Sequence, residues 1–345
     1  MYDYVTNRKP GMGAIVARPY SHQGGYHAGI EKMSMGWCGD FGGDWSGLQL
    51  QINNIYQSAE AGYGAVATEI AGFMRAKANK NQFIRYTQFG AMTAGMINGG
   101  ENGGFENHLP WWHDDETTNI YRYCVSLHNE LVPYIFSTIV DSHLNGGSII
   151  QDVSFSDESH KLGSDIFTKA ITSSDNNVSF ALPAEGEWID FFSGTHYSAG
   201  STVSRSFPYT EFPLFIKAGA IIPMDIHTAV TGIGDVSMEG RKTILMYPDG
   251  TVNTRLLHLP NGEGIDYTDI TITYDAPNGI LTTTSDKSSD YTFILNEIDR
   301  QPQVTGADSW TYNPTKKILR IDATGANISI SITFSDIPQK AFPNY

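Results

Sequence analysis

The sequence changes character near residue 147, and this change constrains the fold more than any other feature of the chain. Between about residues 12 and 145, short apolar runs alternate with segments of helical spacing; after residue 147, short Val-, Ile-, Phe- and Thr-rich runs are separated by Gly, Asn, Asp and Pro. Alternating strands and helices predict a parallel sheet or barrel, whereas short strands with frequent turns predict β-sandwiches. With a second break near residue 235, we predict an α/β segment over residues 1–147 and all-β domains over residues 148–234 and 235–345.

Within the α/β segment, the predicted strands lie at residues 14–17, 32–38 and 64–70. Apolar residues at helical spacing predict helices over residues 47–61 and 116–144, the second of which is interrupted by Pro133. Residues 80–97 fit either a mainly helical segment or the start of a fourth strand–helix unit, and the pattern leaves both open.

The charge of the chain restricts its partners. Its 37 acidic and 22 basic residues give a formal net charge of −15, and no run of Lys or Arg is present. Binding to a phosphate backbone needs the opposite sign, so we expect no nucleic-acid partner. No apolar run is long enough to cross a bilayer, and the first residues lack the basic start and apolar core of a signal peptide. We therefore expect no membrane association, and the sequence indicates no compartment.

Metal and disulfide chemistry find little support in the sequence. The two cysteines, Cys38 and Cys124, are too few for a disulfide framework, and we expect them to be buried free thiols. His108 and the run from His113 to Asp115 resemble metal ligands only faintly, because their spacing fits no zinc site. We predict no metal and no cofactor.

A glycine-rich loop over residues 36–45 carries two carboxylates, Asp40 and Asp44, between Trp37 and Trp45. It lies between a predicted strand and a predicted helix, where a β/α barrel places its catalytic groups. Glycines let a backbone approach a ligand, and tryptophans offer flat apolar faces on which sugars stack. The alternative is an ordinary strand–helix turn, in which Asp44 caps the helix and Asp40 only shapes the loop.

Seven segments of the chain resemble, in the same order, motifs of glycoside hydrolase family 31, a group of retaining α-glucosidases, α-xylosidases and α-galactosidases. Those in the α/β segment are Arg18 after an apolar run, residues 37–40 (Trp-Cys-Gly-Asp), 69–73 (Glu-Ile-Ala-Gly-Phe), 83–91, and 110–111 with 131–135. Those in the β-rich part are residues 182–194 and 212–223. The resemblance implies the second half of a (β/α)8 TIM barrel followed by two β-sandwich domains, with an α-linked oligosaccharide or glycoside as the ligand.

The same resemblance implies roles for individual residues. Asp40 matches the general acid/base, which needs a raised pKa. Arg18 matches the arginine that binds the sugar at the cleavage subsite. The other residues expected to bind substrate are Trp37, Phe41, Trp45, Glu69 and Trp111. Ordinary structural roles stay open: Asp44 competes for the acid role, Arg18 and Glu69 fit structural ion pairs, and Trp45 and Trp111 fit simple packing.

The departures from the family concern the other half of the active site. Family members carry their nucleophilic aspartate upstream of the arginine, but here only Asp3 precedes Arg18, in no similar motif. Phe41 stands where glucosidases often have Asn, residues 98–102 lack the expected His, and the loop over residues 21–29 is longer, so the sugar stays open. We expect part of a retaining exo-α-glycosidase that is inactive alone, either the product of a truncated gene or one half of a split enzyme whose other half-barrel is supplied by another chain. The alternatives are a non-catalytic carbohydrate-binding or scaffold protein and an unrelated α/β enzyme.

Overall fold

Two compact units make up the chain in a computed structural model, which describes residues 15–21, 25–26, 29, 33–73, 77–99, 108–262 and 266–334. The first unit takes in Met1–Ala218, Met224–Glu239 and His258–Tyr267, and the second takes in Gly219–Pro223, Gly240–Leu257 and Thr268–Tyr345. Most of the predicted α/β segment and most of residues 148–234 therefore belong to one unit. The finer division at residues 147 and 234 stays a prediction.

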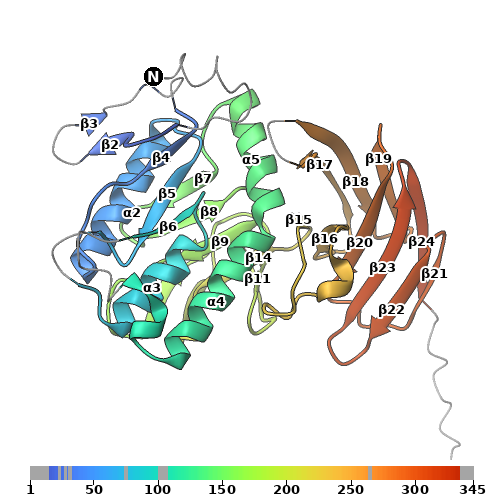
Figure 1. Ribbon diagram of the computed structural model, residues 1–345. Coiled ribbons are helices and arrows are strands. Elements are labelled where there is room, and N and C mark those ends of the chain that lie inside the picture. Colours follow the sequence, from blue (N-terminus) through green and yellow to red (C-terminus); the bar gives the residue numbers. More distant parts are fainter. Residues whose placement is uncertain are drawn as a thin grey trace, which may run out of the picture. The chain divides into compact units, whose positions relative to one another are not determined.

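A four-stranded parallel sheet forms the α/β part of the first unit (Figure 1). Its strands, in spatial order, are β1 (Val16–Ala17), β4 (Met35–Trp37), β5 (Val66–Ile70) and β6 (Met96–Asn98). The register pairs Val16 with Met35, Gly36 with Val66, and Thr68 with Met96. A short hairpin of β2 (Tyr20–Ser21) and β3 (Gly25–Tyr26) follows β1. Ala14, the first residue of the first predicted strand, lies outside the described residues.

Helices follow the strands as the alternating pattern predicts. They are α2 (Trp45–Glu60), α3 (Lys80–Gly90), α4 (Asp115–Glu130) and α5 (Val132–Asn145), with the 3-10 turn η3 (Pro110–Trp112) before α4. The ambiguous residues 80–97 thus contain a helix and then the fourth strand. The long helical segment divides at Leu131, because Pro133 fits only within the first turn of a helix. None of the helices described is both long and apolar enough to span a bilayer.

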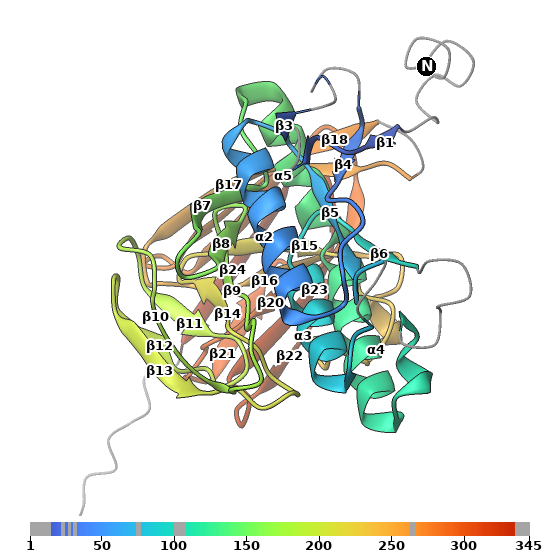
Figure 2. The same ribbon diagram turned by 90° about the vertical axis from the view of Figure 1, so that its left-hand side faces the viewer.

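The β-rich part of the first unit is a small sandwich. A six-stranded sheet in the order β12-β11-β14-β9-β8-β7 accompanies the antiparallel pair β10 and β13, and helix α2 contacts both β5 and β7 (Figure 2). The strands are β7 (Ile150–Ser154), β8 (Ser159–Leu162), β9 (Ile166–Lys169), β10 (Asn177–Ala181), β11 (Trp188–Asp190), β12 (His196–Tyr197), β13 (Thr202–Ser206) and β14 (Leu214–Lys217). Its core contains Phe167, Phe180, Trp188 and Phe215.

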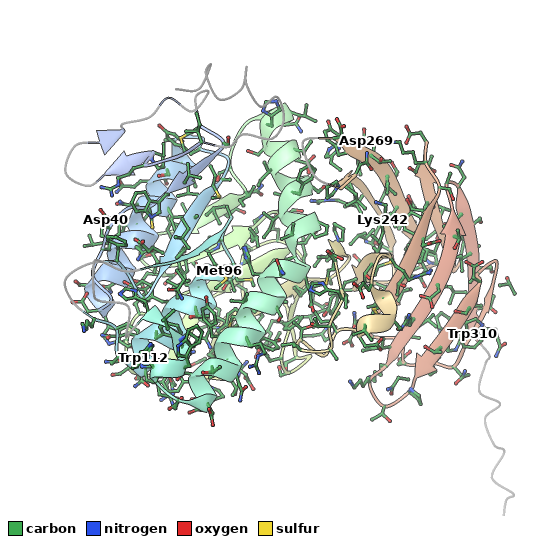
Figure 3. The ribbon with its side chains drawn as sticks, in the orientation of Figure 1. Asp40, Met96, Trp112, Lys242, Asp269 and Trp310 are labelled. Atoms are coloured by element: carbon green, nitrogen blue, oxygen red, sulfur yellow. The ribbon has the colours of Figure 1, made fainter. Side chains whose placement is uncertain are left out.

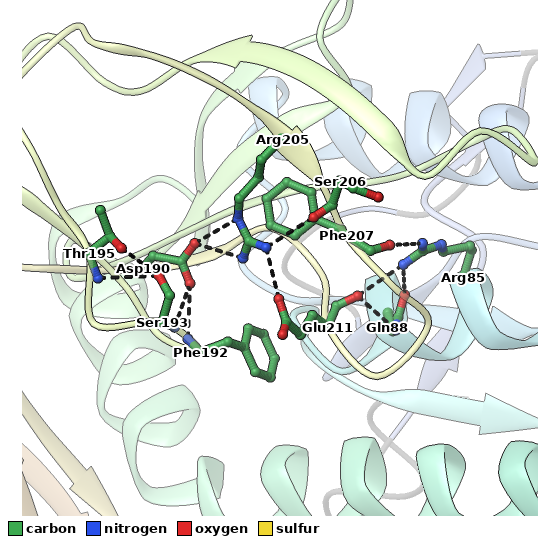
Figure 4. A network of polar contacts seen from close by, with 10 residues as sticks. All are labelled: Arg85, Gln88, Asp190, Phe192, Ser193, Thr195, Arg205, Ser206, Phe207 and Glu211. Atoms are coloured by element: carbon green, nitrogen blue, oxygen red, sulfur yellow. Dashed lines mark hydrogen bonds and ion pairs between the residues drawn. The ribbon is translucent and has the colours of Figure 1, made fainter. Parts of the chain in front are cut away.

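A buried polar network joins α3 to this sandwich within the first unit (Figure 4). Arg85 is 1% exposed and donates to the carbonyl oxygens of Phe207 (2.6 Å) and Glu211 (3.0 Å). Arg205 pairs with Asp190 at 2.8 Å and with the carboxylate of Glu211 at 2.8 Å. Hydrogen bonds and ion pairs therefore join helix α3 to the segment over residues 205–211, and that segment to the end of β11.

Two five-stranded sheets account for most of the second unit, in the orders β15-β16-β20-β23-β22 and β17-β18-β19-β24-β21. Buried and more exposed side chains alternate along β18 and β23, as expected for sheets with one buried face. The strands are β15 (Ile221–Met224), β16 (Lys242–Met246), β17 (Val252–Pro260), β18 (Tyr267–Asp275), β19 (Ile280–Ser285), β20 (Ser289–Leu295), β21 (Pro302–Thr305), β22 (Ser309–Asn313), β23 (Ile318–Gly325) and β24 (Ile328–Phe334).

Candidate active site

The candidate site lies where the parallel strands end. Asp40, labelled in Figure 3, follows β4 by three residues. Arg18 directly follows β1, and Glu69 is the penultimate residue of β5. Because these strands are parallel, their carboxyl ends meet at one edge of the sheet, which is the catalytic edge of β/α barrels. The fold therefore brings three charged residues, far apart in the sequence, to the same edge.

Arg18 and Asp40 form an ion pair at this edge. Nη2 of Arg18 lies 3.1 Å from Oδ2 of Asp40, and the two side chains are 37% and 31% exposed. The guanidinium carbon of Arg18 lies 4.9 Å from the centre of the Trp37 ring, within the range of a cation–π contact. The contact with Trp37 and the bond to Asp40 hold the guanidinium between an aromatic face and a carboxylate.

Two glycines allow the loop that carries Asp40 to pack this closely. At Gly39 the backbone φ is +100°, and an added Cβ would lie 2.6 Å from Nε of Arg18. At Gly72 the φ is +70°, and a Cβ would lie 2.5 Å from the backbone of Gly42. The backbone N–H of Phe73 donates to the carbonyl of Phe41 at 2.8 Å. The loops after β4 and β5 are thus fixed against each other, which preorganises the edge.

Glu69 is the buried carboxyl of the site, with 2% of its surface exposed. Burial, and then the negative charge of Asp40, raise its pKa from the ordinary 4.5 to about 8. Within the described part of the chain, its Oε2 and the Nε1 of Trp37 are buried without a hydrogen bond of good geometry, and the indole N–H lies close enough to the carboxyl to oppose part of this rise in pKa. A neutral carboxyl and an indole N–H suit the hydroxyl groups of a neutral ligand, since both can donate hydrogen bonds.

Gln51 is a member of the site that the sequence analysis missed. It lies on α2, is fully buried, and exchanges two hydrogen bonds of 3.0 Å with the backbone N–H and C=O of Glu69. Its Oε1 also accepts from the thiol of Cys38 at 3.1 Å. A polar residue on the buried face of an amphipathic helix was the available signal, because such a side chain must find partners inside.

Not all the predicted residues take part in these contacts. The contacts above join Arg18, Trp37, Asp40 and Glu69. The ring of Phe41 is buried, Trp45 is half-buried at the start of α2, and Trp111 is 64% exposed in η3. Their binding roles stay predictions.

Other predicted groups can also be placed. The carboxylate of Asp44 caps α2 by accepting from the N–H of Gly47 at 2.9 Å, as the alternative interpretation of the loop expects. Cys38 and Cys124 are buried free thiols, which confirms that prediction. In the described part of the chain, no three His, Cys, Asp or Glu side chains gather closely enough to hold a metal ion. Asp3, residues 22–24, 27–28 and 100–102 lie outside the described residues.

The raised pKa of Glu69 predicts a pH-dependent stability. Because its pKa is about 8 in the folded chain and 4.5 ordinarily, its contribution to stability is complete below pH 4.5 and is lost as the pH rises through 8. Glu69→Gln keeps the neutral form at every pH. We expect the free energy of unfolding of the variant to increase, relative to the unaltered chain, between about pH 5 and pH 8.5. Urea unfolding at both pH values measures this change, and an equal difference at both would contradict it.

Family models match most of the chain outside its C-terminal third. A model of the glycosyl hydrolases family 31 TIM-barrel domain matches residues 2–138, and one of the glycosyl hydrolase family 31 C-terminal domain matches residues 136–222. The chain belongs to glycoside hydrolase family 31. This confirms the predicted family and the predicted fold class, a partial barrel of that family followed by β-domains.

Curated proteins and solved structures of family 31 extend the comparison. Human neutral α-glucosidase C is 25% identical over 265 residues, which are 72% of this chain and 28% of that protein. An α-xylosidase of Saccharolobus solfataricus is 25% identical over 213 residues, 57% of this chain and 29% of that protein. The chain therefore spans less than a third of either relative.

Among solved structures, the cycloalternan-forming enzyme of Listeria monocytogenes, in complex with a pentasaccharide substrate, has a TM-score of 0.79 and 18% identity, over 96% of this chain and 34% of that one. A Flavobacterium johnsoniae dextranase complexed with glucose has a TM-score of 0.77 and 17% identity, over 96% of this chain and 47% of that one. At sequence identities of 17–18%, the similarity to these structures shows a shared fold and nothing further.

Proposed function

We propose that this family 31 chain provides the acid/base side of the active site of a retaining exo-α-glycosidase. The observation that carries the proposal is the cluster of Arg18, Asp40 and the buried Glu69 at the carboxyl edge of the parallel sheet. In this proposal, Asp40 is the general acid/base, and no carboxylate of this sequence is assigned as the nucleophile.

The proposed chemistry is a double displacement. A nucleophilic carboxylate, about 5–5.5 Å from the acid/base, attacks the anomeric carbon while Asp40 gives its proton to the leaving oxygen. The negative charge of that nucleophile favours the protonated acid, which the ion pair of Asp40 with Arg18 opposes. Asp40 then takes a proton from the water that cleaves the glycosyl intermediate, so the configuration is retained. Since Arg18 engages Oδ2 of Asp40, we assign the proton transfer to Oδ1.

The remaining polar groups of the site suit an uncharged sugar. The neutral carboxyl of Glu69 and the indole N–H of Trp37 donate to hydroxyl groups, and Arg18 offers further donors in a fixed fork. The relatives include an α-glucosidase and an α-xylosidase, and the similar structures include one complexed with glucose. These similarities support an α-linked glycoside and leave the sugar and the linkage to experiment.

The sheet order suggests where the rest of the barrel joins. Among the described strands, β1 and β6 each have one neighbour in the parallel sheet, and Val16 of β1 is 48% exposed. Open strand edges and uncovered apolar side chains destabilise a half-barrel. We propose that these edges pair with barrel strands that carry the nucleophile, supplied by another chain or by another part of the same protein.

The test compares binding with turnover for the chain alone. We expect glucose, xylose or galactose to bind in calorimetry and the matching 4-nitrophenyl α-glycosides to stay intact. Arg18→Ala should weaken binding by about tenfold or more, while Arg122→Ala, an exposed arginine on α4, should leave it unchanged.

The possible outcomes separate the candidate functions. Hydrolysis by the chain alone, lost in Asp40→Asn, would place a nucleophile within this sequence and overturn the proposed division of the site. Sugar binding that Arg18→Ala does not weaken would overturn the site itself. Sugar binding with no hydrolysis, even after the missing barrel half is supplied, would favour the non-catalytic carbohydrate-binding alternative.

A further inference from the structure

Two adjacent tryptophans of η3 are unusually exposed. Trp111 is 64% exposed and Trp112 is 60% exposed, while Trp188 of the sandwich is fully buried. A tryptophan normally buries a large part of its apolar surface, and an exposed pair of this size indicates a binding surface.

The turn that presents the two indoles is rigidly held. Within η3, the N–H of Trp112 donates to the carbonyl of Leu109 at 3.1 Å, and the N–H of His113 donates to that of Pro110 at 3.1 Å. The ring of His113 packs on Phe83 of α3 with the ring centres 5.1 Å apart. The indoles therefore extend from a fixed backbone, so binding a ligand costs little ordering entropy.

The start of α4 anchors the other side of this turn. Asp114 caps α4 by accepting from the N–H of Thr117 at 2.8 Å, and Lys80 at the start of α3 donates to Asp114 at 2.7 Å. Because α3 follows β5 and α4 follows β6, their first residues lie at the carboxyl edge of the sheet. The ring of His108, two residues before η3, is buried and lies close to the backbone of Ile70 and Gly72 at the end of β5. The exposed tryptophans thus belong to the same edge as Asp40 and Glu69.

The chemistry around the pair selects the kind of ligand. Asp115 and Glu116, which follow the tryptophans, are exposed carboxylates, of which Glu116 pairs with Lys80, and the whole chain carries a net charge of −15. This field disfavours phosphate and other anions. Flat apolar faces flanked by hydrogen-bond acceptors instead match a neutral pyranose, which has apolar C–H faces and hydroxyl groups around its rim.

We propose that Trp111 and Trp112 form an outer subsite, which stacks a distal sugar of an α-linked oligosaccharide whose terminal sugar lies at Asp40. This proposal rests on the proposed function, because it assumes that the edge at Asp40 binds the terminal sugar. It adds that the chain distinguishes oligosaccharides from monosaccharides and simple glycosides.

Calorimetry with sugars of increasing length tests the outer subsite. The probes are glucose and the maltose and isomaltose series up to five units, titrated into the full chain. We expect the affinity to rise about tenfold or more from one unit to the longer members of one series. Trp111→Ala combined with Trp112→Ala should abolish this gain, and Trp112→Ala alone should reduce it and leave glucose binding unchanged. Leu144→Ala removes a side chain that is 58% exposed on α5 and should change neither value.

The outcomes separate this proposal from the proposed function. A length-dependent gain that survives in the double variant, or no gain in the unaltered chain, would overturn the outer subsite while glucose binding still supports the inner site. Loss of glucose binding in Arg18→Ala tests the inner site alone. If the unaltered chain is a dimer in size-exclusion chromatography and the double variant is a monomer, the tryptophans form a protein interface and the sugar proposal is overturned.

Discussion

Asparagine at position 40 is expected to lower kcat/KM for disaccharide hydrolysis by about 10²–10⁴-fold in the completed barrel. The amide cannot give a proton to the leaving sugar oxygen, which is a poor leaving group without one. The corresponding α-glycosyl fluoride needs little protonation of its leaving group, so the kcat/KM of Asp40→Asn for the fluoride, which reports formation of the glycosyl intermediate, should be much closer to that of the unaltered enzyme. Its kcat should still fall, because Asp40 is also the base of the second step. The measurement is the ratio of the two rates, made with this chain after the nucleophile-bearing part of the barrel has been supplied.

Asp44 offers a matched control only four residues away. Its carboxylate accepts from the N–H of Gly47 at 2.9 Å and from the hydroxyl of Ser46 at 3.2 Å, so it serves as the N-cap of α2. Asparagine is an equally good N-cap, and Asp44→Asn should leave both rates within about twofold. If Asp44→Asn loses disaccharide hydrolysis and Asp40→Asn does not, the acid role belongs to Asp44.

Much of the α/β fold can be predicted from local patterns. All five residues of β5 are buried, and the run from Ala65 to Ala67 with Ile70 gives the strand its apolar pattern in the sequence. The division between α4 and α5 follows from Pro133, whose missing N–H is tolerated only in a first helical turn. Strand β6 is harder to predict, because its three residues are all only partly buried and carry little pattern.

The candidate site is predictable in part, because its motifs are local while its electrostatics are not. Asp40 and Arg18 were identified from short motifs, and the structure pairs them at 3.1 Å. The protonation of Glu69 depends on burial and on the charge of Asp40, a residue 29 positions earlier in the chain. The two hydrogen bonds between the side chain of Gln51 and the backbone of Glu69 require α2 to lie against the end of β5. No local sequence pattern specifies this packing.

Arg85→Met should destabilise the first unit by about 3–5 kcal/mol. Burial lowers the pKa of the guanidinium only to about 10, so Arg85 is a buried cation at neutral pH. It donates to four oxygens at 2.6–3.0 Å, two of them backbone carbonyls and two of them side-chain amides. Methionine keeps much of the volume and has no donor, so these buried oxygens would lose their partner. Urea unfolding at neutral pH measures the loss.

Two further variants keep this prediction open to contradiction. Arg122→Met removes an exposed arginine on α4 whose hydrogen bond, among the described residues, is to Asn119 of its own helix, and should cost less than about 0.5 kcal/mol. Arg85→Lys keeps the charge and has three donors on a single nitrogen, which cannot span four oxygens arranged for a planar fork. Its loss should lie between those of Arg85→Met and Arg122→Met, and it gives a folded comparison if Arg85→Met does not fold. If Arg85→Met costs no more than Arg122→Met, the network in Figure 4 does not stabilise the junction of α3 with the sandwich.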